Sequence, residues 1–195
     1  MSTSAETGGA SRGHLPGDLA MWFFILAELS VFAILILAFA VTQVLKPQMF
    51  SESRLLLNTS TGLAMTLSLI TAGLFAALAQ EQVRRSQPRH GAAFLLVALL
   101  AASLYVVLKV TEYRHLLASG LGMEHNTFFT LYWILTGFHF LHVLLGMFIL
   151  GWLAERCRRG LYGADNHSGF ESGVLYWHMV DLIWVVLFPL VYVLN

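Results

Sequence analysis

Several ionisable side chains lie inside long apolar stretches of this sequence. They are Glu28, Lys109, Glu112, His139, His142, His178 and Asp181. In hydrocarbon, an unpaired carboxylate near the middle of a helix costs roughly 3 kcal/mol on insertion scales. Each of these groups therefore needs a protein partner, water or a lipid head group, and each is a candidate site residue.

Metal binding is the first chemistry that these residue types could support. His139 and His142 lie one helical turn apart in TGFHFLHVLLG, and His178 and Asp181 repeat that spacing in YWHMVDLIW. Neutral imidazoles are good metal ligands, and a carboxylate can orient one of them. The other histidines are scattered, however, and do not form the dense boxes of membrane di-iron hydroxylases. We therefore expect no metal and no catalytic residue here, and interpret the histidines as hydrogen-bonding groups between helices. A membrane metalloenzyme that uses these four residues is the alternative.

Proton handling is the second chemistry. Lys109 and Glu112 share one helical stripe, which predicts an ion pair near a membrane interface. Glu28 is expected to be structural or to face lipid, and a proton-coupled transporter that uses Glu28 and Glu112 is a further alternative. Asn58 begins a segment rich in small and hydroxylated residues, which favours close helix packing. We expect one interhelical polar network that contains Asn58, Lys109, Glu112, His139, His142, His178 and Asp181.

Long membrane helices must position these side chains. Apolar residues make up 57% of the chain and charged residues only 11%, and the mean hydropathy is +0.71. A bilayer core of about 30 Å needs roughly 20 apolar residues in helical form. The sequence predicts an all-α integral membrane bundle with transmembrane helices at residues 19–44, 55–80, 91–117, 127–154 and 174–194. Aromatic residues near the span ends suit interfacial anchoring, namely Trp22, Trp152, Tyr162 and Tyr192.

Charge in the connections predicts the orientation. Seven basic residues fall on the side of the amino-terminal tail and three on the opposite side. The positive-inside rule then places the N-terminus in the cytoplasm and the C-terminus in the periplasm. We expect residues 1–18 to form a flexible cytoplasmic tail and residues 19–195 to form the membrane domain. A net charge of zero argues against a nucleic-acid partner.

An ordered set of motifs resembles subunit III of the haem-copper oxidases, the cytochrome c oxidase subunit III family. The motifs are FILAELSVF, LLNTST, TEY, TFF, TGFHFLHVLLG, NHSGFE and YWHMVDLIW. Compared with the seven-helix form of that subunit, the chain is similar to the last five helices alone. LPGD, HNTFF and YWHMVDLIWVVLFPLVY are most similar to a branch associated with bacterial nitric oxide reductase, and short quinol oxidase subunits are also similar.

The resemblance implies a non-catalytic accessory subunit of a bacterial haem-copper complex of the nitric oxide reductase or cytochrome c oxidase type. Subunit III of a quinol oxidase is the alternative within the family. The expected partner is a catalytic, haem-containing subunit in the bacterial inner membrane, while this chain binds no cofactor itself. The family role is to support assembly, bound lipid and sustained turnover. Phospholipid binding carries over to Glu28 and Arg156, although the two missing helices form one wall of the family's lipid cleft.

Overall fold

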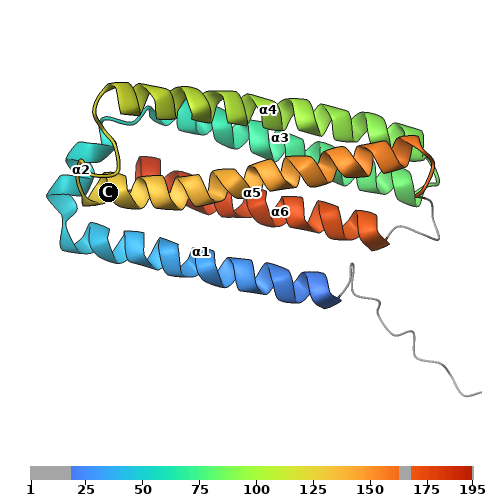
Figure 1. Cartoon of the computed structure of the whole chain (residues 1–195), viewed down its shortest axis with the longest axis horizontal. Coiled ribbons are helices and arrows are strands. Elements are labelled where there is room, and N and C mark those ends of the chain that lie inside the picture. The colour runs from blue at the N-terminus through green and yellow to red at the C-terminus, as the bar shows by residue number, and fades with distance from the viewer. Residues whose placement is uncertain (1–18, 163–167, 195) are drawn as a thin grey trace, which may run out of the picture.

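Five long helices form the body of the protein in a computed structural model that describes residues 19–162 and 168–194. Figure 1 shows them running nearly side by side. They are α1 (Leu19–Leu45), α3 (Thr59–Arg84), α4 (Pro88–Ala118), α5 (Thr127–Arg158) and α6 (Ser168–Phe188). A short helix, α2 (Pro47–Arg54), follows α1, and a π-helix, η1 (Pro189–Val193), continues α6. The predicted tail at residues 1–18 lies outside the described residues.

All five long helices are long and apolar enough to cross a membrane, with mean hydropathies of 1.9 to 2.7. The prediction of an all-α bundle with five spans is therefore confirmed. Several predicted boundaries differ from the structure by three to six residues, and the starts of the second and fifth spans show why. The second span begins at Thr59 and not at residue 55, because Asn58 caps the helix there. The fifth begins at Ser168, before the apolar run, because its first turns contain the polar sequence SGFES.

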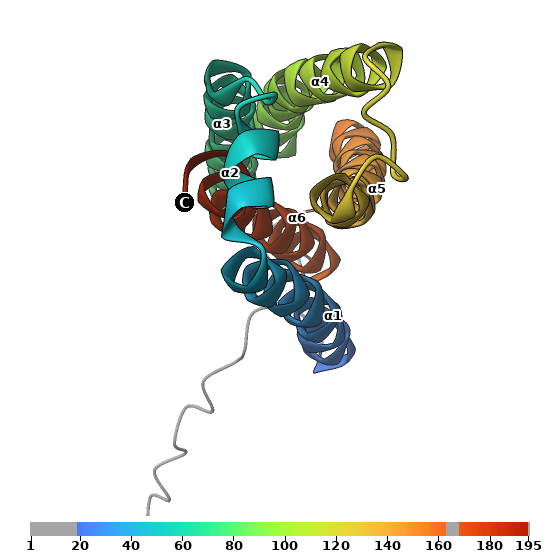
Figure 2. The same cartoon turned by 90° about the vertical axis from the view of Figure 1, so that its left-hand side faces the viewer.

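The helices α3, α4, α5 and α6 pack in sequence order, and α6 returns to contact α3. Figure 2 shows this closed arrangement end-on, with α1 placed outside it against α6. Only 17% of the most apolar window of α1 is buried, compared with 50% for α3. Ala72, Ala76 and Ala79 of α3 are completely buried, so small side chains allow close helix packing. Helix α1 therefore presents most of its apolar surface to the surroundings.

Helix α2 is a feature that the sequence prediction missed, since residues 46–54 were treated as a connection. Pro47 starts the helix, a position where its missing N–H costs no helical hydrogen bond. Figure 2 shows α2 lying across one end of the bundle, between α1 and α3. Phe50 fixes it there by edge contacts with Phe39 of α1 and Phe128 of α5, at ring-centroid distances of 5.1 and 5.2 Å.

The end of α6 is tied to α2. Pro189 has no backbone N–H, and from this residue the chain continues as a π-helix. Arg54 donates hydrogen bonds from Nε to the carbonyl oxygen of Val191 (3.1 Å) and from Nη2 to that of Leu190 (3.2 Å). Burial lowers the pKa of Arg54, but a guanidinium stays charged in proteins. One side chain thus satisfies carbonyl groups at the last turn of the bundle.

Candidate functional site

Lys109 is the most deeply buried charge in the described part of the chain. Its side chain is 0% exposed, and it lies 3.3 Å from Glu112 Oε2, whose side chain is 8% exposed. Its ammonium group also donates to the hydroxyl groups of Tyr132 and Tyr192, each at 3.0 Å. Tyr192 in turn donates to both oxygens of Glu112, at 2.8 and 3.0 Å. The predicted pair is present, and two tyrosines from other elements complete it.

Aromatic rings surround the ammonium group of Lys109. Its Nζ lies 4.8 to 5.6 Å from the ring centroids of Tyr113, Tyr132, Trp184 and Tyr192. Cations at this distance from a ring face are attracted by its quadrupole. The buried charge is therefore compensated by a carboxylate, two hydroxyl groups and ring faces. This cluster joins α4, α5, α6 and η1. The interfacial role expected for Tyr192 is wrong, because only 3% of this residue is exposed.

His139 joins three helices. Its Nε2 lies 3.1 Å from the carbonyl oxygen of Val180 in α6, and its Nδ1 lies 3.1 Å from the hydroxyl of Tyr105 in α4. A carbonyl only accepts hydrogen bonds, so Nε2 carries the proton and Nδ1 accepts from the tyrosine. The ring is completely buried. Both nitrogens are thus occupied within the protein, and neither is free to bind a metal.

His142 pairs with Glu28 across α5 and α1. Its Nε2 lies 3.0 Å from Glu28 Oε2, and its Nδ1 donates to the carbonyl oxygen of Phe138 at 2.8 Å. Because Nδ1 is a donor, a single proton lies between Nε2 and the carboxyl group, on one side or the other. The two side chains are 11% and 22% exposed. Glu28 therefore has a protein partner and also reaches the surface of the bundle.

The remaining predicted residues lie apart from these groups. His178 Nδ1 is 3.6 Å from Asp181 Oδ2, too long for a hydrogen bond, and the Asp181 carboxylate packs against Gly73 of α3. Asn58 accepts a hydrogen bond from the backbone N–H of Thr61 at 3.1 Å, which caps α3. The predicted polar residues are thus divided among separate clusters and do not form one continuous network.

Arg156 lies near the far end of α5. Its guanidinium carbon is 4.7 Å from the Trp152 ring centroid and 5.1 Å from that of Tyr162. Its Nε is buried and makes no hydrogen bond to the described residues. Burial raises the pKa of Tyr162, so its hydroxyl stays protonated beside the arginine. The two rings hold Arg156 in place while its guanidinium keeps unused hydrogen-bonding capacity.

Several polar contacts escaped the sequence interpretation. Arg84 at the end of α3 binds Glu171 at the start of α6, with Nη2 and Oε1 2.6 Å apart. Trp184 donates from its indole N–H to the hydroxyl of Thr66, at 3.0 Å. The signal that these residues share is a polar group on an apolar membrane helix, but their pairing follows only from the packing of α3 against α6. These contacts fix the two helices at the middle and at one end.

A membrane metalloenzyme would need several of the predicted histidine and carboxylate side chains to meet at one metal site. Within residues 19–162 and 168–194, no three histidine, cysteine, aspartate or glutamate side chains come together as a ligand set. His139, His142 and the His178–Asp181 pair each have different neighbours. The arrangement is therefore suited to holding helices together and to placing a few polar groups at the membrane-facing surface.

Known proteins match this chain along nearly its whole length. The profile of the family described as Cytochrome c oxidase subunit III matches residues 16–195. Cytochrome c oxidase subunit 3 of Synechocystis sp. is 30% identical over 196 aligned positions, covering 98% of this chain and 83% of the relative. Quinol oxidase subunit 3 of Bacillus subtilis is 27% identical over 184, covering 91% and 86%. Heme-copper oxidase subunit I+III of Aeropyrum pernix is 29% identical over 179, covering 89% of this chain and 22% of that longer protein.

Proposed function

Because this chain belongs to the cytochrome c oxidase subunit III family, we propose that it is the non-catalytic accessory subunit of a bacterial haem-copper respiratory complex. The observation that carries the proposal is a family match over residues 16–195, which includes every membrane helix. The polar clusters agree with an accessory role, since their side chains bind one another across the helices. Electron transfer and gas reduction are then the work of a partner subunit that carries the haem.

The partner that we propose is the catalytic subunit of the complex, subunit I. Support comes from the Aeropyrum pernix relative, whose name joins subunits I and III in one protein and of which this chain matches 22%. Helix α1 offers a surface of the right kind, because Phe23, Ile34 and Leu37 are 61 to 72% exposed along its length. An apolar helix face of this kind is covered by lipid or by another membrane protein.

Purification from the native membrane tests this proposal. The full chain, extracted in mild detergent with an affinity tag, should bring with it a haem-containing subunit that is visible in the optical spectrum. The oxygen- or nitric-oxide-reducing activity of that preparation should decline faster over repeated turnover when this chain is removed. Recovery of a colourless homo-oligomer under conditions that preserve other respiratory complexes would contradict the proposal.

We also propose the nitric oxide reductase branch as the more specific assignment, on the similarity of LPGD and HNTFF to that branch. The relatives described above are instead subunits of cytochrome c and quinol oxidases. Measuring whether the co-purified complex consumes nitric oxide or oxygen, with quinol and with cytochrome c as donors, separates these assignments. Consumption of oxygen alone would exclude the nitric oxide reductase assignment while leaving the accessory role intact.

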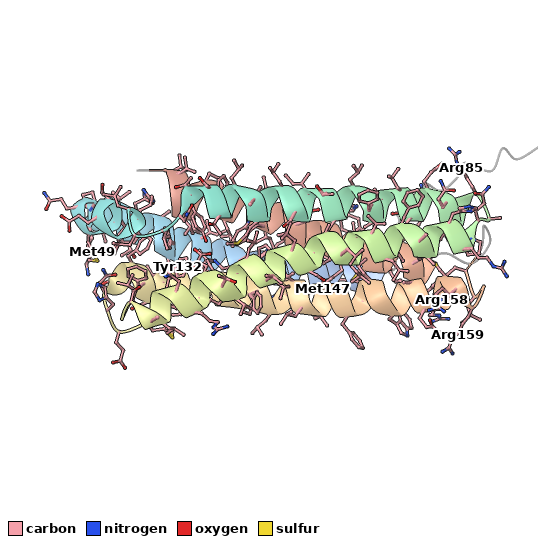
Figure 3. All side chains as sticks on the ribbon, turned by 90° about the horizontal axis from the view of Figure 1, so that it is seen from above. Met49, Arg85, Tyr132, Met147, Arg158 and Arg159 are labelled. Carbon is pink, nitrogen blue, oxygen red and sulfur yellow. The ribbon has the colours of Figure 1, made fainter. Side chains whose placement is uncertain are left out.

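The proposed orientation is an N-terminus in the cytoplasm. Figure 3 shows Arg85, Arg158 and Arg159 together at the end of the bundle opposite Met49 of α2. Such clustering of arginines at one membrane face is typical of the cytoplasmic side. Single cysteines introduced at Gln48 and at Gln82 provide the test, because only the former should react with an impermeant maleimide in intact spheroplasts.

Phospholipid binding at Glu28 and Arg156 is a separate part of the proposal. The Arg156 guanidinium rests on two aromatic rings and has a buried Nε without a hydrogen-bond partner among the described residues. A phosphate group is the natural partner for a guanidinium held in this way. Replacing Arg156 with Gln should lower the amount of co-purified phospholipid. The Arg158→Gln variant serves as the control, because that side chain is 68% exposed.

A further inference from the structure

The His178–Asp181 pair of α6 has no role in the proposal above. Asp181 lies twelve residues from each end of the span Gly169–Val193, and therefore at the centre of the membrane. Polar groups are most costly at this depth. The side chain of His178 is nevertheless 40% exposed, and that of Asp181 is 15% exposed. Two ionisable groups thus reach the surface of the chain at the membrane midplane.

Asp181 receives no hydrogen bond from the described part of the chain. His178 Nδ1 is 3.6 Å from its Oδ2, and the carboxylate packs against Gly73 of α3, which has no side chain to donate. Glu28 and Glu112, by comparison, each have a side-chain nitrogen within 3.3 Å. Even with one proton shared between His178 and Asp181, the carboxyl oxygens keep unused capacity to accept hydrogen bonds.

An apolar groove lies beside the pair, between α1 and α6. Its volume is about 290 Å³, and its lining residues are Ile25, Leu29, Leu175, His178, Met179 and Leu182. Among these six residues His178 alone is polar. Both α1 and α3 contact α6, and Figure 2 shows α6 lying between them. The polar pair therefore lies on the outward face of α6, with the groove on one side and Gly73 on the other.

The depth of the pair decides what can cover it. Hydrocarbon chains carry no hydrogen-bond donor, and lipid head groups lie beyond a core of about 30 Å, which is roughly 15 Å from the midplane. Ordered water needs two to four polar partners, and the groove offers only His178. A transmembrane helix of another protein supplies both apolar side chains and a donor at this depth. Such a helix is therefore the occupant that fits this face.

The charge of the pair indicates which side chain that helix carries. His178 can hold the positive charge that balances Asp181, so what the pair lacks is a donor and not a counter-charge. A hydroxyl or carboxamide group meets this need without adding a charge at the midplane. A second carboxylate would be repelled by Asp181.

We propose that a transmembrane helix of the catalytic subunit docks on the face of α6 around His178 and Asp181, with a hydroxyl or carboxamide side chain donating to the Asp181 carboxylate. Leu182, which is 59% exposed, packs against the same helix. The groove makes this face continuous with the exposed side of α1. The inference rests on the proposed function for the identity of the partner, and it adds the surface and the groups that recognise that partner.

Photocrosslinking in the native membrane locates the docking surface. Benzoylphenylalanine is introduced in place of Leu182, or in place of Leu104 of α4 as the control. Leu104 is 51% exposed and also lies near the middle of its helix, on the side of the bundle away from α1 in Figure 2. The probe at position 182 should crosslink to the haem-containing subunit, and the probe at position 104 should not. Equal crosslinking from both positions would overturn the inference, as would crosslinks from position 182 only to lipid, to a second copy of this chain or to a different protein.

The same preparation separates the two proposals. If the haem-containing subunit co-purifies and the probe at position 182 gives no crosslink to it, the docking surface is wrong while the proposed function stands. If no haem-containing subunit is recovered under any mild condition, both are wrong.

A pair of substitutions at Asp181 tests the hydrogen bond. Asp181→Asn keeps a carbonyl oxygen that accepts, so the haem-containing subunit should be retained nearly as well as by the unmodified chain. Asp181→Ala removes the acceptor without a clash against Gly73. The apparent Kd for that subunit should then rise about three- to twentyfold, the range measured for one hydrogen bond between membrane helices. An apparent Kd for Asp181→Ala equal to that of the unmodified chain would overturn the inference.

Thermal unfolding of the full chain distinguishes docking from a role in the fold. Asp181→Ala deletes a carboxylate that has no donor among the described residues, so the midpoint should stay the same or rise. Thr111→Val is the control for both measurements, because Thr111 is exposed on α4 and its hydroxyl donates to the Val107 carbonyl of its own helix at 2.7 Å. A lower midpoint for Asp181→Ala than for Thr111→Val would show that the carboxylate stabilises this chain itself, which contradicts the inference.

Discussion

Arg54 Nε lies 3.1 Å from the carbonyl oxygen of Val191, although the two residues are 137 positions apart in the sequence. The contact joins the short helix α2 to the π-helix at the end of α6. It also supplies donors to carbonyl groups of the last turn, which have no N–H further along the helix to bond them. The first connection and the last turn of the chain are thereby made interdependent.

Replacing Arg54 with Met is therefore expected to destabilise the protein. The substitution keeps most of the side-chain volume but leaves two buried carbonyl groups without a donor, which costs about 1–3 kcal/mol. The apparent midpoint of thermal unfolding in detergent, followed by circular dichroism, measures the effect. Arg85→Met is the control, because Arg85 is 66% exposed and its ion pair with Glu81 contributes little. Equal midpoints for the two variants would show that Arg54 has no structural role.

The Lys109–Glu112 pair should behave as a coupled unit. Lys109→Met or Glu112→Gln alone leaves one buried charge without its partner, for which about 3–5 kcal/mol is expected. The double variant removes both charges, so it should be more stable than either single variant. A double-mutant cycle on thermal midpoints in one detergent measures this coupling. Additive losses would mean that the two side chains do not stabilise each other.

Two glycines of α5 should respond oppositely to alanine. A Cβ at Gly146 would lie 2.8 Å from Trp177 Cε3, so Gly146→Ala must push α5 and α6 apart at a cost of about 1–3 kcal/mol. A Cβ at Gly137 would meet no atom within 4 Å. Gly137→Ala should therefore stabilise the helix by up to about 1 kcal/mol through backbone entropy. Thermal midpoints that move in the same direction would contradict the packing described for α5 and α6.

Replacing the Glu28 carboxylate with an amide is expected to change lipid retention and turnover of the complex more than the stability of the fold. In Glu28→Gln the amide can donate to His142 Nε2, so the fold should persist, while lipid retention or sustained turnover of the complex should fall. Glu28→Leu leaves the imidazole nitrogen without a partner and should cost about 1–3 kcal/mol of stability. Lipid content, turnover over repeated cycles and thermal midpoints are compared with Glu52→Gln, an exposed carboxylate on α2. Unchanged lipid content together with unchanged turnover in Glu28→Gln would refute this role.

The long helices could be predicted from the sequence because hydropathy alone decides whether a segment enters the bilayer. Helix α2 could not, because its eight residues are mostly polar and too few to span a membrane. The sequence features that indicate α2 are Pro47, which starts the helix, and Phe50, whose burial depends on rings from two other helices. Leu55 to Leu57 belonged to the predicted second span because they are apolar, but Asn58 starts the helix after them.

The candidate site could be predicted only where partners lie close in sequence. Lys109 and Glu112 share one helix face, so their pairing follows from spacing. The partner of Glu28 is His142, and which of the histidines meets it depends on how α1 and α5 are rotated and placed. The tyrosines around Lys109 come from α4, α5 and η1, and aromatic residues in membrane helices are too common to indicate such a cluster.

The contact between Glu28 and His142 has a consequence for biogenesis. Helix α1 is synthesised before the other described helices, but its carboxyl group meets its partner only when the chain has grown by another 114 residues. At 5–20 residues per second this delay is roughly 6 to 23 seconds. For that time Glu28 must be sheltered by the insertion machinery, by water or by lipid head groups. Helix α1 is therefore a late-docking element, whose final position is fixed only after α5 has been synthesised.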